Sequence, residues 1–482
     1  MNTALNIARR AGEFAELADG RTVDVLVVGG GVTGAGVALD AAARGLSVAL
    51  VEAQDLAFGT SRFSSKLVHG GLRYLANGEV GLAYESAVER GILMSRVAPH
   101  LIRTLPQLVA LTEQTPARNA IITRVGLHAG DLLRRAARTS GTLLPPPRRV
   151  SAAEALALVP GLRRDGLRGG LLSFDGQLVD DARLVVMLAR TAAGHGARIL
   201  TRVRAEELDG DGARVRDLLT GHAVRLRARA VVNATGVWAG ELVDSVRLRP
   251  SRGSHLVLDG ARLGLTGTAL MVPIPGSLNR FALLLPQQDG RCYLGLTDEP
   301  LDGPIPDVAT VPESDVDFLL SIGSAALARP LTRADVIGRF AGLRPLVAAG
   351  SGKTADLSRR HAVVTGPNGV VTVVGGKLTT YRRMAQDAVD AVVTARGLSA
   401  GSSSTRNIRL VSHSVVDSEP VLPGGTVTRA DVRRAVREEG ALTVEDVLDR
   451  RTRLGLVERD RDAALPEVSA LVDKCLAEFG GC

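Results

Sequence analysis

The chain has 482 residues, with 59 lysines and arginines against 51 aspartates and glutamates, and its formal net charge of +8 is spread along the sequence. Its 45% hydrophobic content is typical of a globular protein of roughly two or three domains and excludes a disordered one. Because only 3% of the residues are aromatic, few side chains could stack on single-stranded nucleic acid, and the charge favours an anionic small substrate or an anionic membrane surface.

The N-terminal region predicts a βαβ unit. The first strand is expected in VDVLVVGGG, residues 23–31, which enters a glycine turn. The helix follows at residues 32–45 and the next strand at 47–55. Because strand, tight turn, helix and strand follow one another within about 30 residues, the two strands should lie parallel in an open α/β sheet.

The middle of the chain alternates between helical and strand patterns. Residues 82–140 show a helical periodicity that ends at the prolines of LLPPPRRV, which cannot continue a helix. A helix that returns to a strand is expected at 180–200, and a strand that runs into a turn of small residues at 227–240. Between 250 and 335, short apolar runs broken by Gly, Pro and Asp at hairpin spacing predict an antiparallel sheet.

The last third resumes the first pattern and then becomes helical. A further strand, glycine turn and helix is expected at 369–393, so a nucleotide-type fold returns with other material inserted. The AGSSS run at 400–404 marks a boundary. Residues 428–478 should be helical, with Thr443 and the glutamate of TVEDVLDRR forming a capping pair.

The glycine turn is the strongest chemical motif. Gly29, Gly31 and Gly34 form the pattern G-x-G-x-x-G, and Glu52 ends the following strand. Glycines permit the tight turn and the close approach of backbone to a pyrophosphate at the helix N-terminus, while an acid at the second strand end accepts from a ribose hydroxyl. Together they predict a dinucleotide site, but they do not choose between FAD and NAD.

Two later turns favour FAD. Ala234, Thr235 and Gly236 follow a strand, where backbone must pass close to something, and Gly375 and Gly376 open a helix. The amides of that helix could face partial negative charge on a flavin ring. Either turn alone could be ordinary, but with the glycine motif they suggest an extended FAD.

Residues 64–75, SSKLVHGGLRYL, gather uncommon residues around a glycine pair. Lys66 is one of few lysines in a chain whose basic residues are mostly arginine, and Tyr74 is one of four tyrosines. The combination with His69 and Arg73 suggests chemistry more than solubility.

The chain resembles the FAD-dependent glycerol-3-phosphate dehydrogenases of the D-amino-acid-oxidase-like superfamily, from about residue 20 to residue 400. The motifs that carry the resemblance are DVLVVGGGVTGAGVALDAAARGLSVALVEAQDLAFGTSRFSSKLVHGGLRYL, APHL, SFDGQLVDDARL, NATGVWAG, SRGSHLVL, GLTDEP, AGLRPLV and VVGGKLTTYR. SSKLxHGGLRYL and GGKLTTYR are specific to these dehydrogenases, whereas the glycine fingerprint is shared more widely. The resemblance implies oxidation of sn-glycerol 3-phosphate to dihydroxyacetone phosphate in glycerol or glycerophospholipid catabolism, by hydride transfer from C2 to flavin N5, with electrons passed to a membrane quinone.

The expected fold is α/β, with three parts. A discontinuous Rossmann-like FAD-binding domain should comprise residues 1–90, 165–250 and 336–400. An antiparallel-sheet substrate domain should comprise residues 91–164 and 251–335, and a short C-terminal helical cap residues 401–482. The region after 400 is shorter than the family's cap and lacks its front part between about 411 and 428.

The family positions also imply site residues. Arg73, Arg344 and Arg359 are the expected phosphate clamp, because a planar guanidinium binds phosphate oxygens bidentately. His255 is the first candidate for the base or hydroxyl partner. Lys377 is the second, as a base or as a positive charge that steadies the reduced ring, and Arg344 is counted with these two as catalytic.

The residues expected around a non-covalently bound FAD are Gly29, Gly30, Gly31, Val32, Thr33, Gly34, Glu52, Ser64, Ser65, Lys66, Gly70, Gly71, Ala234, Thr235, Gly236, Gly375, Gly376, Lys377, Leu378 and Thr379. The glycine pair should let backbone pass close to the ring and begin a helix that carries Arg73 and Tyr74 toward substrate, with Tyr74 donating to the phosphate or the ring. His69 could touch the flavin or shape the turn. The three cysteines show no metal-ligand spacing, so no metal site is expected.

Two positions depart from the family pattern. Arg360 stands where an acid is usual, which could alter the charge beside the expected phosphate arginine. Phe174 stands where a tyrosine is common, which we interpret as packing.

The location and two competing functions complete the expectations. The N-terminus lacks the apolar core of a signal peptide, and no run of about 18 apolar residues occurs, so we expect a cytoplasmic protein or one peripheral on the inner face of the cytoplasmic membrane. The family also implies contact with a quinone and a homodimer. An FAD-dependent amine or amino-acid oxidase of the same superfamily, and a basic flavoprotein without turnover, stay open as alternatives.

Overall fold

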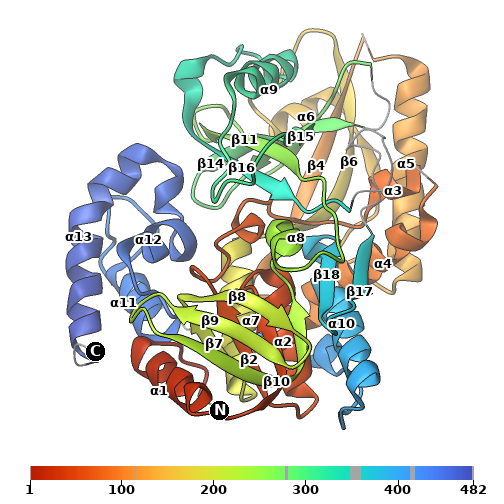
Figure 1. Cartoon of the computed structure of the whole chain (residues 1–482). Helices are drawn as coiled ribbons and strands as arrows, with labels where there is room; N and C mark the ends of the chain where they lie inside the picture. The colour runs from red at the N-terminus through yellow and green to blue at the C-terminus, as the bar shows by residue number, and fades with distance from the viewer. Residues whose placement is uncertain are drawn as a thin grey trace.

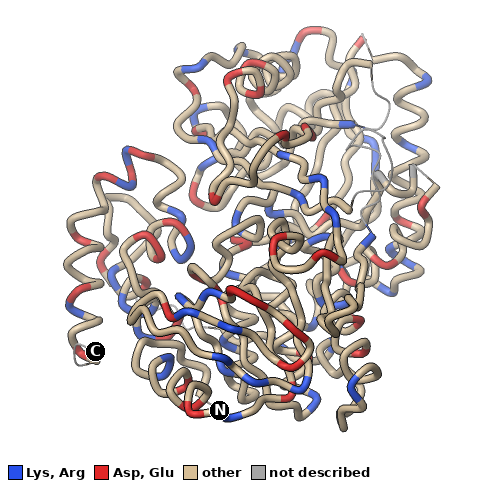
Figure 2. Tube along the Cα trace, in the orientation of Figure 1, with Lys and Arg blue, Asp and Glu red and all other residues tan. Residues whose placement is uncertain are grey.

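The structure, a computed structural model, describes residues 2–76, 78–113, 115–276, 280–347, 360–412 and 418–479. Two β-sheets occupy the lower and upper parts of the view in Figure 1, and the C-terminal helices lie along one side. Figure 2 shows that basic and acidic residues are interspersed through all of these parts, so the positive net charge does not gather in one region of the fold.

The first sheet is built around parallel strands. Its main strand order is β17, β18, β10, β1, β2, β7, in which β18, β10, β1, β2 and β7 run parallel and β17 is antiparallel. The bounds are β1 (Val23–Val28), β2 (Val48–Glu52), β7 (Arg198–Thr201), β10 (Ala223–Asn233), β17 (His361–Thr365) and β18 (Val371–Gly375). The predicted βαβ unit, and the return of the same fold later in the chain, are confirmed.

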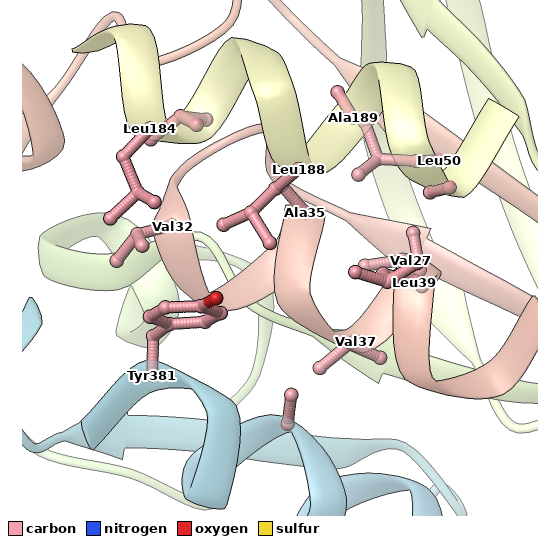
Figure 3. Close-up of a cluster of buried hydrophobic side chains, with 14 of the residues drawn as sticks. Val27, Val32, Ala35, Val37, Leu39, Leu50, Leu184, Leu188, Ala189 and Tyr381 are labelled. Carbon is pink, nitrogen blue, oxygen red and sulfur yellow. The ribbon is translucent and has the colours of Figure 1, made fainter. Parts of the chain in front are cut away.

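Three helices cover one face of this sheet: α2 (Val32–Ala43), α7 (Asp181–Gly194) and α10 (Tyr381–Arg396). Helix α2 packs between the other two (Figure 3), and Val27 of β1 belongs to the same core. Successive side chains of a strand point to opposite faces, so Leu26, next to Val27, belongs to the core on the other face of the sheet.

The opposite face is covered by an antiparallel extension of the sheet. Strands β8 (Val203–Asp209) and β9 (Gly212–Asp217) form a hairpin that pairs with the first half of β10. Helix α1 (Ile7–Ala18) adds Phe14 and Leu17 to this core.

The second sheet is mainly antiparallel, and its main strand order is β15, β11, β14, β13, β12, β4, β6, β3. In addition, β16 pairs with β11 and β5 pairs with β6. The bounds are β3 (Leu67–Val68), β4 (Ile102–Thr112), β5 (Arg148–Val150), β6 (Leu167–Leu178), β11 (Ser251–Asp259), β12 (Ala269–Pro273), β13 (Phe281–Pro286), β14 (Arg291–Gly295), β15 (Glu299–Pro300) and β16 (Val336–Arg344). The antiparallel sheet predicted between 250 and 335 is confirmed.

The structure corrects two expectations about this sheet. Residues 82–140 are not helical throughout, because β4 lies among them as a half-buried strand that pairs with β6 along its whole length. Strands β6 and β16 fall inside the ranges predicted for the FAD-binding domain, yet both belong to the second sheet. Pairing between residues that are 55 to 76 positions apart in sequence is not visible in local periodicity.

The helices between β3 and β16, apart from α7, are α3 (Leu72–Ala76), α4 (Val80–Ile92), α5 (Ala117–Ala136), α6 (Ala152–Leu158), α8 (Ala239–Leu242) and α9 (Glu313–Ala326). Of these, α6 and α9 contact strands of the second sheet. Among the described residues, no helix is both long enough and apolar enough to cross a membrane.

The C-terminal region contains α11 (Arg429–Glu438), α12 (Val444–Asp446) and α13 (Glu458–Ala477) around its own apolar core. The expected capping pair needs a correction. Thr443 does cap α12, but its partner is Asp446, at the third helical position, and not Glu445. This region, which we call the C-terminal domain (residues 418–479), packs beside α1 and the first sheet (Figure 1).

Candidate active site

A cavity of about 870 Å³ lies between the two sheets. One wall consists of the carboxyl ends of the parallel strands, where Glu52, Ala234 and Gly375 line it. The other wall comes from the second sheet and includes His255 of β11 and Arg344 of β16. Ligands of open α/β sheets bind at the carboxyl ends of the strands, so the cavity has the position of a cofactor site.

The residues predicted for the site gather in this cavity to a large extent. Those that line it are Gly29, Gly31, Val32, Thr33, Glu52, Ser64, Ser65, Gly70, Tyr74, Ala234, Thr235, Gly236, His255, Arg344, Gly375, Gly376, Lys377, Leu378 and Thr379. Gly30, Gly34 and Gly71 belong to the same turns but do not line the wall.

The turn between β1 and α2 can only be made by glycines. A Cβ atom on Gly34 would lie 1.9 Å from the carbonyl oxygen of Gly29. Gly29 itself has a φ of +109°, and a Cβ there would lie 2.6 Å from the carbonyl oxygen of Ala234. Gly31 caps α2 without a side-chain bond, so the turn leaves a bare helix N-terminus at the cavity. This cradle fits the pyrophosphate of FAD.

Glu52 closes the same turn from the end of β2. One carboxylate oxygen accepts from the backbone N–H of Gly30 at 2.6 Å, and the other accepts from that of Gln54 at 2.8 Å. Burial raises the pKa of this carboxyl, although both backbone bonds act in the opposite direction. Its contact with a ribose hydroxyl stays a prediction.

Lys66 requires a correction, because its side chain does not line the cavity. It is 1% exposed, and its ammonium group donates to Asp181 and to the carbonyl oxygens of Arg62 and Ser64, at 3.0 to 3.1 Å. Burial lowers its pKa to about 8. Lys66 therefore supports the wall from behind, while Ser64 and Ser65 face the cavity.

The two stretches SSKLVHGGLRYL and GGKLTTYR meet in the structure. The backbone N–H of His69 donates to the hydroxyl of Thr379 at 3.3 Å. The ammonium nitrogen of Lys377 lies 3.8 Å from the centre of the Tyr74 ring. Segments more than 300 residues apart thus build one corner of the cavity.

His69 shapes this corner with a defined tautomer. The backbone N–H of Gly71 donates to its Nδ1 at 3.2 Å, so Nδ1 carries no proton in this arrangement, and a neutral ring holds its hydrogen on Nε2. The ring also stacks at 6.4 Å on Tyr74.

Ser86 and Tyr74 both contact the ammonium group of Lys377. Its ammonium group donates to the hydroxyl of Ser86 at 2.5 Å, besides lying over Tyr74. The Ser86 hydroxyl donates in turn to the carbonyl oxygen of Leu82 at 2.7 Å. Because the hydroxyl hydrogen is used there, Ser86 offers Lys377 a lone pair.

His255 lies on β11 at the opposite wall. Its ring stacks on Phe340 at 4.7 Å, and its Nε2 lies 2.9 Å from the hydroxyl of Ser65. Burial lowers the pKa of this imidazole to about 3, and the positive charges of Lys66 and Arg344 lower it further in the same direction. The ring is therefore neutral at ordinary pH.

Arg344 reaches the cavity from the end of β16. Its guanidinium donates to the carbonyl oxygen of Thr297 at 3.0 Å and to the hydroxyl of Ser251 at 3.2 Å, and pairs with Asp298 at 3.3 Å. A Cβ on Gly253 would lie 2.2 Å from it, so the neighbouring strand leaves room for this side chain.

Four further residues named by the sequence predictions are Arg73, Arg359, Arg360 and Phe174. Arg359 lies outside the described residues, and of Arg73 only the place in α3 is described. Arg360 is exposed. Phe174 lines the cavity and packs against the cores of both sheets, so packing accounts for it.

Sequence reasoning missed several residues at this site. Arg90 of α4 lines the cavity and pairs with Asp175 at 2.7 Å, and Asp175 also accepts from the backbone N–H of Gly70 at 3.3 Å. Ser86 and Asp181 were missed as well. Asp181 starts α7 inside the quoted stretch SFDGQLVDDARL, which was a usable signal, whereas nothing in the local pattern marks Ser86 or Arg90.

Among the residues that the structure describes, no group of three or more His, Cys, Asp and Glu side chains could hold a metal ion.

Comparisons with known proteins agree with this geometry. Residues 24–382 match the family described as "FAD dependent oxidoreductase", and residues 398–477 match the "C-terminal domain of alpha-glycerophosphate oxidase". The chain is 52% identical over 499 aligned residues to "Glycerol-3-phosphate dehydrogenase 1" of Mycobacterium tuberculosis, covering 96% of this chain and 97% of that one. It is 42% identical to "Glycerol-3-phosphate dehydrogenase 2" of the same organism, covering 81% of this chain and 66% of that one.

Solved structures show the same fold. A glycerol-3-phosphate dehydrogenase from Bacillus halodurans, complexed with FAD, has a TM-score of 0.72 at 24% identity, covering 98% of this chain and 96% of that one. An L-alpha-glycerophosphate oxidase from Mycoplasma pneumoniae with FAD bound has a TM-score of 0.62 at 18% identity, covering 82% of this chain and all of that one. On the family match and the 52% identity, the chain belongs to the FAD-dependent oxidoreductases and, among them, to the glycerol-3-phosphate dehydrogenases.

Proposed function

We propose that this protein oxidises sn-glycerol 3-phosphate to dihydroxyacetone phosphate. One observation carries the proposal: the two dehydrogenase-specific stretches meet at Lys377 and Tyr74 in the cavity that His255 and Arg344 also line. When bound, FAD supplies the acceptor for the two electrons of the alcohol. The chain's own residues must then bind the phosphate, orient C2 and manage the hydroxyl proton.

Arg344 is the proposed phosphate ligand, because its fixed guanidinium can form charge-assisted bonds to a dianion. Its bonds to Ser251 and Thr297 hold the head group in one orientation before substrate arrives. Arg73 and Arg359 stay proposed partners on the strength of the family pattern alone.

His255 is the proposed partner of the substrate hydroxyl. A neutral imidazole can accept a proton, which an imidazolium cannot. The pKa of about 3 belongs to a buried ring beside Lys66 and Arg344, whose lowering effects together with burial outweigh the raising effect of the Asp181 carboxylate. A substrate dianion beside the ring would favour its charged form, so its pKa should rise when substrate binds.

Lys377 is proposed to act as a fixed positive charge and not as the base. The face of an aromatic ring attracts a cation, and the lone pair of Ser86 requires a donor. The ring contact favours the ammonium form, and Ser86 accepts one of its hydrogen bonds. A cation here would stabilise negative charge that develops during the reaction.

Helix α5 supports a membrane quinone as the electron acceptor. Its outer face exposes Ile121, Val125 and Leu132 at 62 to 65%, with Arg118 and Arg124 beside them. Its inner face contributes Leu127 to the cavity. An apolar face with arginines suits an anionic lipid surface, and we propose that α5 rests on the inner face of the cytoplasmic membrane, where quinone is available.

A flotation assay tests this contact. The triple variant Ile121→Gln, Val125→Gln, Leu132→Gln should lose binding to vesicles of anionic lipid and keep its activity with a soluble dye. The same assay on Phe318→Gln, an exposed apolar residue of α9 on another helix, is the control. Equal binding by the triple variant and wild type would remove α5 from the contact.

Flavin absorbance tests the substrate. Under anaerobic conditions, sn-glycerol 3-phosphate should bleach the bound flavin, whereas glycerol, glycine and D-alanine should not. Bleaching by glycine or D-alanine instead would favour the amine-oxidase alternative. Stable absorbance of fully loaded protein with every one of these compounds would favour the flavoprotein without turnover.

A further inference from the structure

An arginine of the C-terminal domain reaches the wall of the active site. Arg453 is 7% exposed. Its Nε lies 3.2 Å from a carboxylate oxygen of Asp180 and its Nη1 lies 3.5 Å from one of Asp181, while its Nη2 donates to the carbonyl oxygen of Arg62 at 2.7 Å. Arg453 therefore contacts both the start of α7 and the backbone of Arg62, at the beginning of the segment 62–66.

Asp181 in turn binds the segment 62–66 through hydrogen bonds. One of its oxygens accepts from the backbone N–H of Ser64 at 2.8 Å, from the Ser64 hydroxyl at 2.7 Å and from the ammonium group of Lys66 at 3.0 Å. Asp181 is wholly buried, so water does not compete for these hydrogen bonds.

Ser65 lies in the chain between Ser64 and Lys66, which both bind Asp181. Its hydroxyl is 2.9 Å from Nε2 of His255. The imidazole is neutral at ordinary pH, so the contact is a hydrogen bond between two uncharged groups. Because Ser64 and Lys66 are both tied to Asp181, the hydroxyl of Ser65 has little freedom, and it sets the direction in which the His255 ring can bond.

Lys66 and Arg453 both have strained backbone conformations. Lys66 and Arg453 have φ values of +57° and +64°, a region that favours glycine. Long side chains remain in such conformations when surrounding contacts over-determine them, which is common at functional sites.

We propose that Arg453 is a positioning residue for His255, acting through Asp181, Lys66 and Ser65. The C-terminal domain is thereby part of the catalytic centre without touching substrate or cofactor. The inference rests on the proposed role of His255, and it assigns to Lys66 and Asp181 the work of holding Ser65 in place.

The test compares two buried arginines of the C-terminal domain. Arg451 binds Asp55 at 2.8 and 2.9 Å and the carbonyl oxygen of Glu439, so it joins the same domain to the first sheet away from Ser65. Arg453→Met should lower kcat per bound flavin by about 10- to 100-fold, with the KM for glycerol 3-phosphate nearly unchanged. Arg451→Met should lower thermal stability and leave kcat per bound flavin close to that of wild type.

A milder pair keeps the proposal testable should Arg453→Met not fold. Arg453→Lys and Ser65→Ala should each lower kcat, and the double variant should be no slower than the slower single variant, because both act on the same imidazole. Equal kcat values for Arg453→Met and Arg451→Met, or independent effects in the double variant, would overturn the proposal. Absence of bleaching in wild type would instead refute the proposed function.

Discussion

The glycine turn after β1 and the segment 62–66 both border the cavity, but they are held in different ways. The turn is fixed by the absence of side chains, since a Cβ on Gly34 would overlap the backbone of Gly29. The segment is fixed by ion pairs and hydrogen bonds from Asp181 and Arg453, which are 115 to 391 residues away. Steric constraint within a few residues can be read from a sequence, whereas a charge network across domains cannot.

The largest effect should come from breaking the turn. Gly34→Ala would place a Cβ 1.9 Å from the carbonyl oxygen of Gly29, so the turn must open and we expect purified protein with little or no flavin. Gly126→Ala, at a helical glycine with nothing within 4 Å, is the matched control and should keep its flavin. Flavin absorbance per protein measures both, and a yellow Gly34→Ala protein would contradict this account of the turn.

Arg344→Ala comes next and sharpens the difference between cofactor and substrate binding. Loss of the proposed phosphate ligand should lower kcat/KM for glycerol 3-phosphate by roughly 100- to 1,000-fold while FAD stays bound. Arg339→Ala removes an arginine on the same strand that pairs with Glu313 at the surface, so it should behave as wild type. Normal turnover by Arg344→Ala would remove this arginine from the site.

Tyr74 separates a role of its ring from a role of its hydroxyl. If the ring face holds Lys377, Tyr74→Phe should retain most activity, and Tyr74→Leu should lose about 10-fold in kcat. If the hydroxyl donates to substrate, as the sequence suggested, Tyr74→Phe should be as slow as Tyr74→Leu. Steady-state kinetics of the two loaded enzymes distinguish these outcomes.

The smallest effect concerns pH. The pKa of His255 falls from 6.5 to about 3 on folding, chiefly because of burial. Between these values the unfolded chain binds a proton on this imidazole that the folded chain does not, so stability should decline as pH falls through this window. In His255→Asn that part of the decline should be absent. Thermal midpoints measured from pH 7 to pH 4 test this, and parallel curves for the two proteins would contradict the shifted pKa.

Much of the fold could be predicted because its signals are local. The βαβ unit over residues 23–52 follows from strand, helix and glycine patterns that lie within one short stretch. Strand β4 was missed because its partner residues in β6 lie 55 to 76 positions further along the chain. The corner at Lys377 could be approached only through the family resemblance.

The finer features of the site had no local signal. Ser86 is an ordinary serine in a helix until Lys377 donates to it from a position 291 residues away. Lys66 is a rare lysine, and its ammonium group bonds Asp181 behind the cavity wall and not at the predicted cofactor site. The sequence predicted which residues are unusual, but their partners decide what they do.

The central claim is that the cavity oxidises sn-glycerol 3-phosphate. Loaded protein, mixed anaerobically with limiting substrate, should form one dihydroxyacetone phosphate for each flavin bleached, measured by trapping the product while following absorbance. Loss of flavin absorbance without that product, or no loss of absorbance at all, would contradict the claim.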